Sequence, residues 1–174
     1  MSKKFFERDA KIVARELLGK IIVRKINGVE KRAKIVETEA YYGREDPASR
    51  ARQNGDLRET MKDEPGTILV YGVHNNWLIN FVTGKKGKAE AVLLRAVEPL
   101  NFEEKSSGPG LLTKALQIDK KFHKQSIINN KELMIIDNPN ENFEIVESFR
   151  IGVKEDLPQK LRFYIKDNKH VSKK

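Results

Sequence analysis

The sequence contains no cysteine. Disulfide bonds, thiolate nucleophiles, cysteine-ligated zinc and iron–sulfur clusters are therefore excluded together. Histidine is scarce as well: His74, His123 and His170 lie far apart in the sequence, without the spacing of metal ligands. We expect neither a metal nor a cofactor, so any chemistry has to use oxygen and nitrogen side chains.

Long apolar runs are also missing. No run approaches the roughly 18 residues that indicate a membrane-spanning helix. Residues 1–20 lack the apolar core of a secretory signal, because charged side chains interrupt them repeatedly. We therefore expect no contact with a membrane and a location in the cytoplasm or on the nucleoid.

What the sequence has in excess is positive charge. Lysine and arginine outnumber aspartate and glutamate by 34 to 25, which gives a formal net charge of +9. Each phosphate that a basic side chain neutralises releases a counterion, so this balance favours nucleic acid as a partner over a merely soluble, lysine-rich surface. The length of 174 residues suits one domain with its own core, and we expect a monomer with a single domain over 1–174.

Apolar periodicity and turn residues predict the order of helices and strands. Asp9 can cap a helix over 10–18, and Asn27-Gly28 favours a tight hairpin turn between the next two strands. Strands are expected at 20–26, 31–42, 67–71, 77–83, 89–100, 132–137, 143–153 and 160–168, and a second helix at 111–116. This order indicates an α+β fold around a curved, mostly antiparallel sheet with flanking helices.

Two segments fall outside this pattern. Residues 43–66 are polar, and Asp46-Pro47 predicts the cap and first turn of a short helix there. The rest of this stretch is expected to form a long surface loop. Residues 169–174 are basic, and we expect them to be loosely held.

The strand that contains KIVETEAYYG carries the first chemical signal. Glu37, Glu39 and Tyr41 are two residues apart, so in an extended chain all three side chains point to one side. Two carboxylates and a phenol along one face of so basic a chain indicate a site.

Seven motifs follow one another along nearly the whole chain: VETEAYYG, EDPAS, PGTILVY, VLLRAVEPL, SGPGLLTKAL, RIGV and LRFYI. In this order they resemble the 3-methyladenine (alkyladenine) DNA glycosylase family. The resemblance implies a single mixed α/β domain with a protruding β-hairpin that enters the minor groove of duplex DNA. It also implies base excision repair by hydrolysis of the N-glycosidic bond of damaged purines, with no metal and no covalent intermediate.

The same resemblance implies three catalytic residues. Glu39 would activate the attacking water, Arg95 would help to hold this water and a nearby phosphate, and Ile151 would contact the water through its main-chain carbonyl. General-base help of this kind is worth about 10²–10⁴-fold in rate. We expect a monofunctional enzyme, because strand cleavage needs an amine nucleophile in the pocket and no motif places a lysine there.

Glu37 has two interpretations. Strand geometry separates its backbone from that of Glu39 by about 7 Å. This value is near the roughly 6.5–9.5 Å carboxyl spacing of inverting glycosidases, so Glu37 could act as a general acid. The interpretation that we favour is a structural salt bridge with a nearby basic group.

The base pocket is expected to have aromatic walls. Tyr41 and Tyr71 resemble the residues that stack the extruded base, and Asn80 resembles the asparagine that obstructs the exocyclic amine of guanine. Extruding a base costs a few kcal/mol, and stacking on an aromatic face returns about 1–3 kcal/mol per base. Two tyrosine faces would therefore roughly offset extrusion from a damaged pair. Without the resemblance, both tyrosines would be interpreted as residues at the edge of the core.

Arg50 departs from the family pattern, which commonly has a pocket histidine at this position. A guanidinium can stack on a base and donate hydrogen bonds, yet its charge repels a cationic alkylpurine. Either Arg50 turns toward a phosphate, or the substrate range has moved toward neutral lesions such as hypoxanthine or ethenoadenine.

The hairpin tip departs too, because the family usually has a tyrosine there. His74 is the first candidate for the wedge that fills the gap left by the flipped nucleotide, and Val73 is the second. The alternative is that His74 is an exposed turn residue. Gly108 and Gly110 at the start of the second helix, with Lys114 on its first turns, suit a phosphate contact.

A different class of function also fits the expected fold. The fold resembles that of the carboxy-terminal domain of methionyl-tRNA formyltransferases, so a nucleic-acid-binding module without chemistry is the alternative. The set of Glu39, Tyr41 and Arg95 distinguishes the two, because a binding module has no use for a buried carboxylate that repels phosphates. A small-sugar glycosidase, a third possibility, fits poorly with the basic surface.

Overall fold

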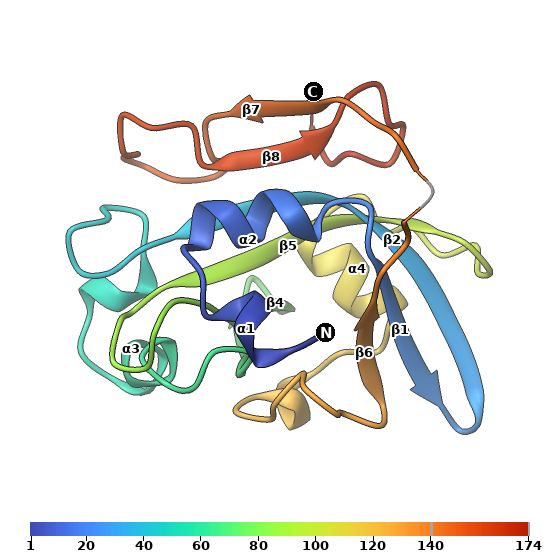
Figure 1. Cartoon of the computed structure of the whole chain (residues 1–174), viewed down its shortest axis with the longest axis horizontal. Coiled ribbons are helices and arrows are strands. Elements are labelled where there is room, and N and C mark those ends of the chain that lie inside the picture. The colour runs from blue at the N-terminus through green and yellow to red at the C-terminus, as the bar shows by residue number, and fades with distance from the viewer. Residues whose placement is uncertain (140, 174) are drawn as a thin grey trace.

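The structure, a computed structural model, describes residues 1–139 and 141–173. A long strand, β2 (Val29–Tyr41), lies at its centre. The other strands are β1 (Ile21–Ile26), β3 (Ile68–Val73), β4 (Asn76–Val82), β5 (Ala91–Pro99), β6 (Leu133–Ile136), β7 (Ile145–Ser148) and β8 (Arg162–Ile165). The sheet has the order β3-β4-β5-β2-β1-β6, with β8 paired to β2 and β7 paired to β8. The pairings are antiparallel and the sheet curls into a half-barrel (Figure 1), which confirms the predicted fold class.

Strand β2 changes partner halfway along its length. Residues 29–34 pair with β1, whereas 37–39 pair with β8, and β5 occupies the opposite edge. The register against β5 is irregular between Ile35 and Thr38, where the partner changes. Bulges of this kind bend a strand and re-aim its side chains. The irregularity therefore lies at the start of the VETEAYYG motif.

Along the strands, side chains that face the main hydrophobic core alternate with side chains that face the opposite side of the sheet. On β5, Val92 and Leu94 belong to the main hydrophobic core, whereas Leu93 and Arg95 line a cavity. Core residues at alternate positions of the other strands include Val36, Ala40, Ile68, Val70, Ile79 and Phe81. Because a strand has a period of two residues, the residues between them face the other way.

The longest helix, α2 (Ala10–Leu17), begins after Asp9, whose carboxylate accepts a hydrogen bond from the Lys11 amide at 2.9 Å. This confirms the predicted helix and its N-cap. Its apolar stripe is buried against β2 and β5 (Figure 1). The remaining helical elements are α1 (Lys3–Phe6), α3 (Asp56–Met61), α4 (Pro109–Ala115) and the 3₁₀ turns η1 (Arg50–Arg52) and η2 (Lys120–Phe122). None of the helices in the described residues is long and apolar enough to cross a membrane.

Two tight turns close the hairpins of the sheet. Asn27 and Gly28 have φ angles of 49° and 82°, which confirms the primed turn predicted between β1 and β2. His74 and Asn75, with φ angles of 47° and 61°, form the corresponding turn between β3 and β4. Histidine and asparagine tolerate this left-handed region better than most residues do.

The prediction of a short helix starting at Asp46-Pro47 is wrong. These residues lie in a turn, and the helical segments of this region are η1 and α3, which also shorten the expected loop. The carboxylate of Asp46 is buried and accepts hydrogen bonds from the amides of Tyr42 and Ala48 and from the Arg150 guanidinium. Its role is to anchor a distant segment rather than to cap a helix.

Two predictions near the end of the chain are also wrong. The strand expected over 143–153 ends at Ser148, because the amide of Ile151 donates to the side chain of Glu39 at 2.8 Å and not to the backbone of a neighbouring strand. The segment expected to be loose is held, since the amide of Ser172 donates to Glu37 at 2.7 Å. Residue 174 lies outside the described residues.

Candidate active site

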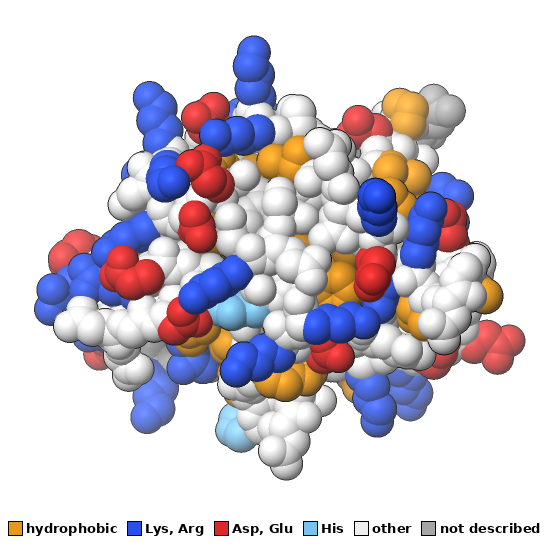
Figure 2. Space-filling model, turned by 90° about the horizontal axis from the view of Figure 1, so that it is seen from below, with side chains coloured by type: hydrophobic (Ala, Val, Ile, Leu, Met, Phe, Trp, Pro, Cys, Tyr) orange, Lys and Arg blue, Asp and Glu red, His pale blue; other side chains and the backbone are white. Residues whose placement is uncertain are grey.

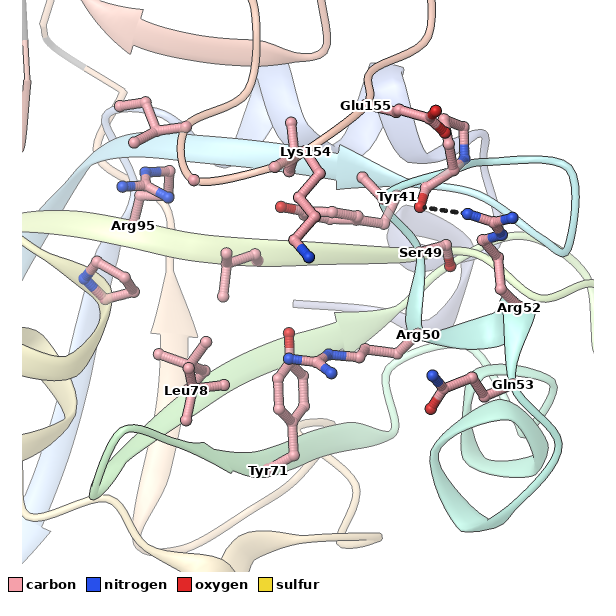
Figure 3. A pocket seen from close by; sticks show the side chains of 18 of the residues that line it. Tyr41, Ser49, Arg50, Arg52, Gln53, Tyr71, Leu78, Arg95, Lys154 and Glu155 are labelled. Carbon is pink, nitrogen blue, oxygen red and sulfur yellow. Dashed lines mark hydrogen bonds between the residues drawn. The ribbon is translucent and has the colours of Figure 1, made fainter.

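An open cavity of about 1200 Å³ lies where the side chains that face away from the main core meet three loops (Figure 3). Its lining comes from β2, β5, the β3–β4 hairpin, residues 47–50, 52 and 53, Pro109 and residues 151–155. Segments far apart in the sequence therefore meet at one place.

Glu39 lies just beneath this cavity and is fully buried. Its Oε1 accepts a hydrogen bond from the Ile151 amide at 2.8 Å, and its Oε2 accepts from the Tyr41 hydroxyl at 2.8 Å and from Arg95 at 3.4 Å. Each of these three donors belongs to a residue that lines the cavity. Burial raises the pKa of Glu39, although the charge of Arg95 and the two shorter hydrogen bonds act against this shift.

Arg95 joins the two carboxylates of β2. Its Nε donates to Glu37 at 3.2 Å and its Nη1 to Glu39 at 3.4 Å. Glu37 also accepts hydrogen bonds from Arg162 and from the Ser172 amide, each at 2.7 Å, and it is buried without lining the cavity. The structural salt bridge is therefore confirmed for Glu37. Two of its three donors, Arg162 and Ser172, do not line the cavity, which leaves the general-acid interpretation without support.

Tyr41 forms one wall of the cavity. Its hydroxyl contacts Glu39, and the guanidinium carbon of Arg150 lies 4.6 Å from the centroid of its ring. Burial, and then the neighbouring carboxylate of Glu39, raise the pKa of Tyr41 well above its ordinary value. The phenol therefore keeps its proton and remains a hydrogen-bond donor to Glu39.

The charge network around Arg150 was not predicted from the sequence. The guanidinium donates to both oxygens of Asp46 at 2.7 Å, to Asp156 at 2.8 Å and to the Ala40 carbonyl at 3.1 Å. Burial alone would raise the pKa of Asp46 and lower that of Arg150. The hydrogen bonds between them outweigh burial, so the pKa of Asp46 is lowered and that of Arg150 is raised. The two residues belong to the EDPAS and RIGV motifs, but neither motif indicates that they pair.

Tyr71 and two further predicted base-binding residues meet beside this wall. Arg50 extends from η1 across Tyr71, with its guanidinium carbon 5.1 Å from the ring centroid (Figure 3). Asn80 is buried and donates to the Leu69 carbonyl at 3.2 Å. Together with Tyr41 these side chains line a small recess that adjoins the cavity. Burial raises the pKa of Tyr71, so its hydroxyl also stays protonated.

The two wedge candidates lie at the rim of the cavity. Val73 ends β3 and the exposed His74 follows it in the turn, and both line the cavity on the same hairpin as Tyr71. The His74 carbonyl accepts a hydrogen bond from the Asn76 side chain at 2.9 Å, which holds the turn.

Gly108, Gly110 and Lys114 do not line the cavity, although Pro109 does. A Cβ at Gly110 would lie 2.7 Å from that of Asn76, so this glycine allows α4 to pack against the hairpin. Gly108 is the buried N-cap residue of α4, and Lys114 is exposed on the helix.

Lys154 lines the cavity as well (Figure 3), a position that no motif indicated.

Elsewhere on the surface, lysine and arginine side chains are spread over the face seen in Figure 2, with acidic side chains among them. Within the part of the chain that the structure describes, no three acidic or histidine side chains gather closely enough to hold a metal ion. The cavity, and not a charged patch, is therefore the best-defined candidate site.

Comparison with known proteins gives similarities over nearly the whole chain. The sequence matches the model of one family, described as methylpurine-DNA glycosylase, over residues 4–169. A protein of Aeropyrum pernix named "Putative 3-methyladenine DNA glycosylase" is 43% identical over 180 residues, which cover 99% of this chain and 93% of that protein. Proteins of the same name from Clostridium tetani and Legionella pneumophila (strain Corby) are each 40% identical, over 100% and 99% of this chain and 99% and 98% of their own lengths.

Proposed function

Since the chain belongs to the methylpurine-DNA glycosylase family and is a DNA glycosylase, a hydrolase of N-glycosyl bonds, we propose that it removes alkylated or deaminated purines from duplex DNA. The damaged nucleotide is flipped out of the duplex, and its base enters the cavity between Tyr41 and Tyr71. Water activated by Glu39 then cleaves the bond between base and deoxyribose. The products are a free base and an abasic site, the starting point of base excision repair.

The setting of Glu39 carries this proposal. Its carboxylate is buried, its pKa is raised, and its three hydrogen-bond donors all belong to residues of the cavity wall. A general base works best when its pKa approaches the working pH, and burial is a common way to achieve this. Arg95 and the Ile151 amide keep the carboxylate oriented, and we assign the Ile151 carbonyl and Arg95 as further contacts of the water.

The tyrosine walls of the cavity support the proposed binding of the base. Tyr41 and Tyr71 come from different strands and offer ring surfaces whose stacking, at about 1–3 kcal/mol per base, offsets the cost of extrusion. Asn80 lines the small recess that adjoins the cavity beside these tyrosines, where a bulky exocyclic group would meet it. Sound pairs are disfavoured because their extrusion costs more than that of a weakened pair.

We also propose that the enzyme leaves the DNA strand intact. Lysines that form Schiff bases are activated by desolvation or by a neighbouring cation. Lys154 lines the cavity, but it is exposed to solvent. It suits a contact with a phosphate better than attack on the sugar.

A direct test uses duplex DNA with a single hypoxanthine, which is incubated with the protein and then treated with hot alkali to cut any abasic site. We expect strand scission after alkali and none before it, and no scission with Glu39→Gln. Tight binding to several lesion duplexes without scission would contradict the proposal and favour a non-catalytic binding module. Scission before alkali would contradict only the monofunctional assignment.

The pH dependence provides a second test. Glu39 must be ionised to accept a proton, and its pKa is raised, so the single-turnover rate should fall with decreasing pH from a point above the ordinary carboxyl range. The charge of Arg95 lowers this pKa, so Arg95→Gln should move the acidic limb of the profile to higher pH. Arg95→Lys keeps the charge and should leave the limb near its wild-type position. An acidic limb that does not move in Arg95→Gln would count against Glu39 as the titrating group.

The hairpin turn allows a test of the proposed wedge. His74 has a positive φ that asparagine also tolerates, so His74→Asn removes the ring without straining the turn. We expect the single-turnover rate to fall about tenfold, which is the scale of one lost stacking contact. Asn75→Gly, at the neighbouring position of the same turn, is the matched control and should change the rate little. Equal effects of the two variants would show that only the turn, and not the imidazole, matters.

A further inference from the structure

We propose that Arg50 makes this site select neutral damaged purines over cationic, ring-alkylated ones. The inference rests on the proposed function, because it concerns the class of base that the same cavity accepts. Arg50 lines both the cavity and the recess, and its guanidinium lies over Tyr71 at 5.1 Å from the ring centroid (Figure 3). A base that enters against this wall meets a planar cation as well as a phenol.

The charge of Arg50 is uncompensated, unlike the charges of Arg95 and Arg150. Arg95 and Arg150 each pair with two carboxylates. Arg50 has no ion pair within residues 1–139 and 141–173. Among the described residues, Glu155 is the carboxylate that lines the cavity. It is exposed and lies beyond ion-pair distance of Arg50. The net charge that a bound base experiences is therefore positive on the Arg50 side.

Each tyrosine of the cavity wall also already contacts one guanidinium. Tyr71 carries the guanidinium of Arg50, and Tyr41 carries that of Arg150 at 4.6 Å from its centroid. An aromatic ring attracts a cation through its electron-rich face, so rings that already hold a guanidinium offer less to a second cation. A purine alkylated on a ring nitrogen is such a cation. Hypoxanthine and ethenoadenine are neutral, and they can stack on the guanidinium plane without repulsion.

A phosphate contact is the other role open to Arg50, and it makes a different prediction. Loss of a phosphate contact weakens binding to every lesion duplex by the same factor, because the backbone is the same in each. Loss of a charge beside the base changes the ratio between neutral and cationic lesions. The ratio of single-turnover rates is therefore the measurement that separates these roles.

The experiment uses two duplexes of identical sequence, one with hypoxanthine and one with 7-methylguanine, whose ring is cationic. Arg50→Gln should lower the ratio of the hypoxanthine rate to the 7-methylguanine rate by about tenfold, the scale of one charge–charge contact weakened by solvent. Arg50→Lys keeps the charge and should keep most of the wild-type ratio. Arg52→Gln removes a neighbouring cavity arginine that donates to the Pro47 carbonyl, and should leave the ratio unchanged.

Each outcome has a distinct meaning. A ratio that stays constant in Arg50→Gln while both rates fall together would overturn the inference and assign Arg50 to a phosphate. An equal shift of the ratio in Arg52→Gln would overturn it too, because the effect would then belong to the general field of the cavity. If the wild type binds both duplexes but releases neither base, the proposed function itself fails, and this inference with it.

Discussion

Replacement of Glu39 by glutamine should lower the single-turnover rate of base release by about 10²–10⁴-fold, the usual contribution of a general base. Glutamine has nearly the same shape and can still accept the hydrogen bond of the Ile151 amide, but it cannot take a proton from water. The affinity for lesion duplexes should stay near that of the wild type. The two quantities are measured by single-turnover kinetics and by equilibrium binding.

The stability of Glu39→Gln distinguishes a lost base from a damaged fold. Burial raises the pKa of Glu39 in the folded protein, so its stabilising contribution is present below the unfolded-state pKa and is lost as the pH rises through the folded pKa. At neutral pH the wild type therefore carries an unfavourable buried charge that glutamine removes. We expect the Tm of the variant at neutral pH to equal or exceed that of the wild type.

Glu155→Gln is the matched control for this experiment, because it removes the same charge from the exposed rim of the cavity. Its rate should stay within about threefold of the wild-type rate, since an exposed charge is screened by solvent. A Glu39→Gln variant that keeps most of its activity would exclude Glu39 as the base. A variant with lost activity and a lower Tm would leave misfolding as the cause.

Arg150→Met should destabilise the protein by about 3–5 kcal/mol, which is the usual cost of removing one partner of a buried ion pair. The side chains of Arg150 and Asp46 are both fully buried, and Arg150 also bonds Asp156. Its loss leaves the Asp46 carboxylate in the interior without a counter-charge. Equilibrium unfolding in urea measures the change.

The pH dependence identifies the unpaired carboxylate as the cause. In the wild type the pKa of Asp46 is lowered, so its contribution to stability is present above the unfolded-state pKa and is lost as the pH falls through the folded value. In Arg150→Met, burial without a partner should raise this pKa, so acid should neutralise the charge. The difference from the wild type should therefore shrink as the pH falls from about 8 to about 5.

Two comparisons complete the test of the buried pair. Arg150→Met combined with Asp46→Asn removes both charges and should be less destabilised than Arg150→Met alone. Arg8→Met makes the same substitution at a partly exposed arginine paired with Glu16, where the expected cost is about 1 kcal/mol or less. If the double variant is as unstable as the sum of the two single ones, lost packing and not the unpaired charge explains the effect.

Much of the architecture followed from local patterns. The cap at Asp9, the turn at Asn27-Gly28 and the alternation of apolar residues predicted α2, the first hairpin and most strands, because these signals act over a few residues. The same alternation predicted that Glu39 and Tyr41 share a face, and the 2.8 Å hydrogen bond between them agrees with this. Lys154 in the cavity and the ion pair of Asp46 with Arg150 had no local signal.

The sequence by itself determined the composition of one face of β2, because in a strand every second side chain points the same way. Only the tertiary structure decided what that face meets. It brings Ile151 to Glu39 and Arg150 to Asp46 across more than a hundred residues, and it lays Arg50 over Tyr71. Such pairings depend on how the bulged sheet curls and on which buried charges have to be neutralised, and both are properties of the folded chain as a whole.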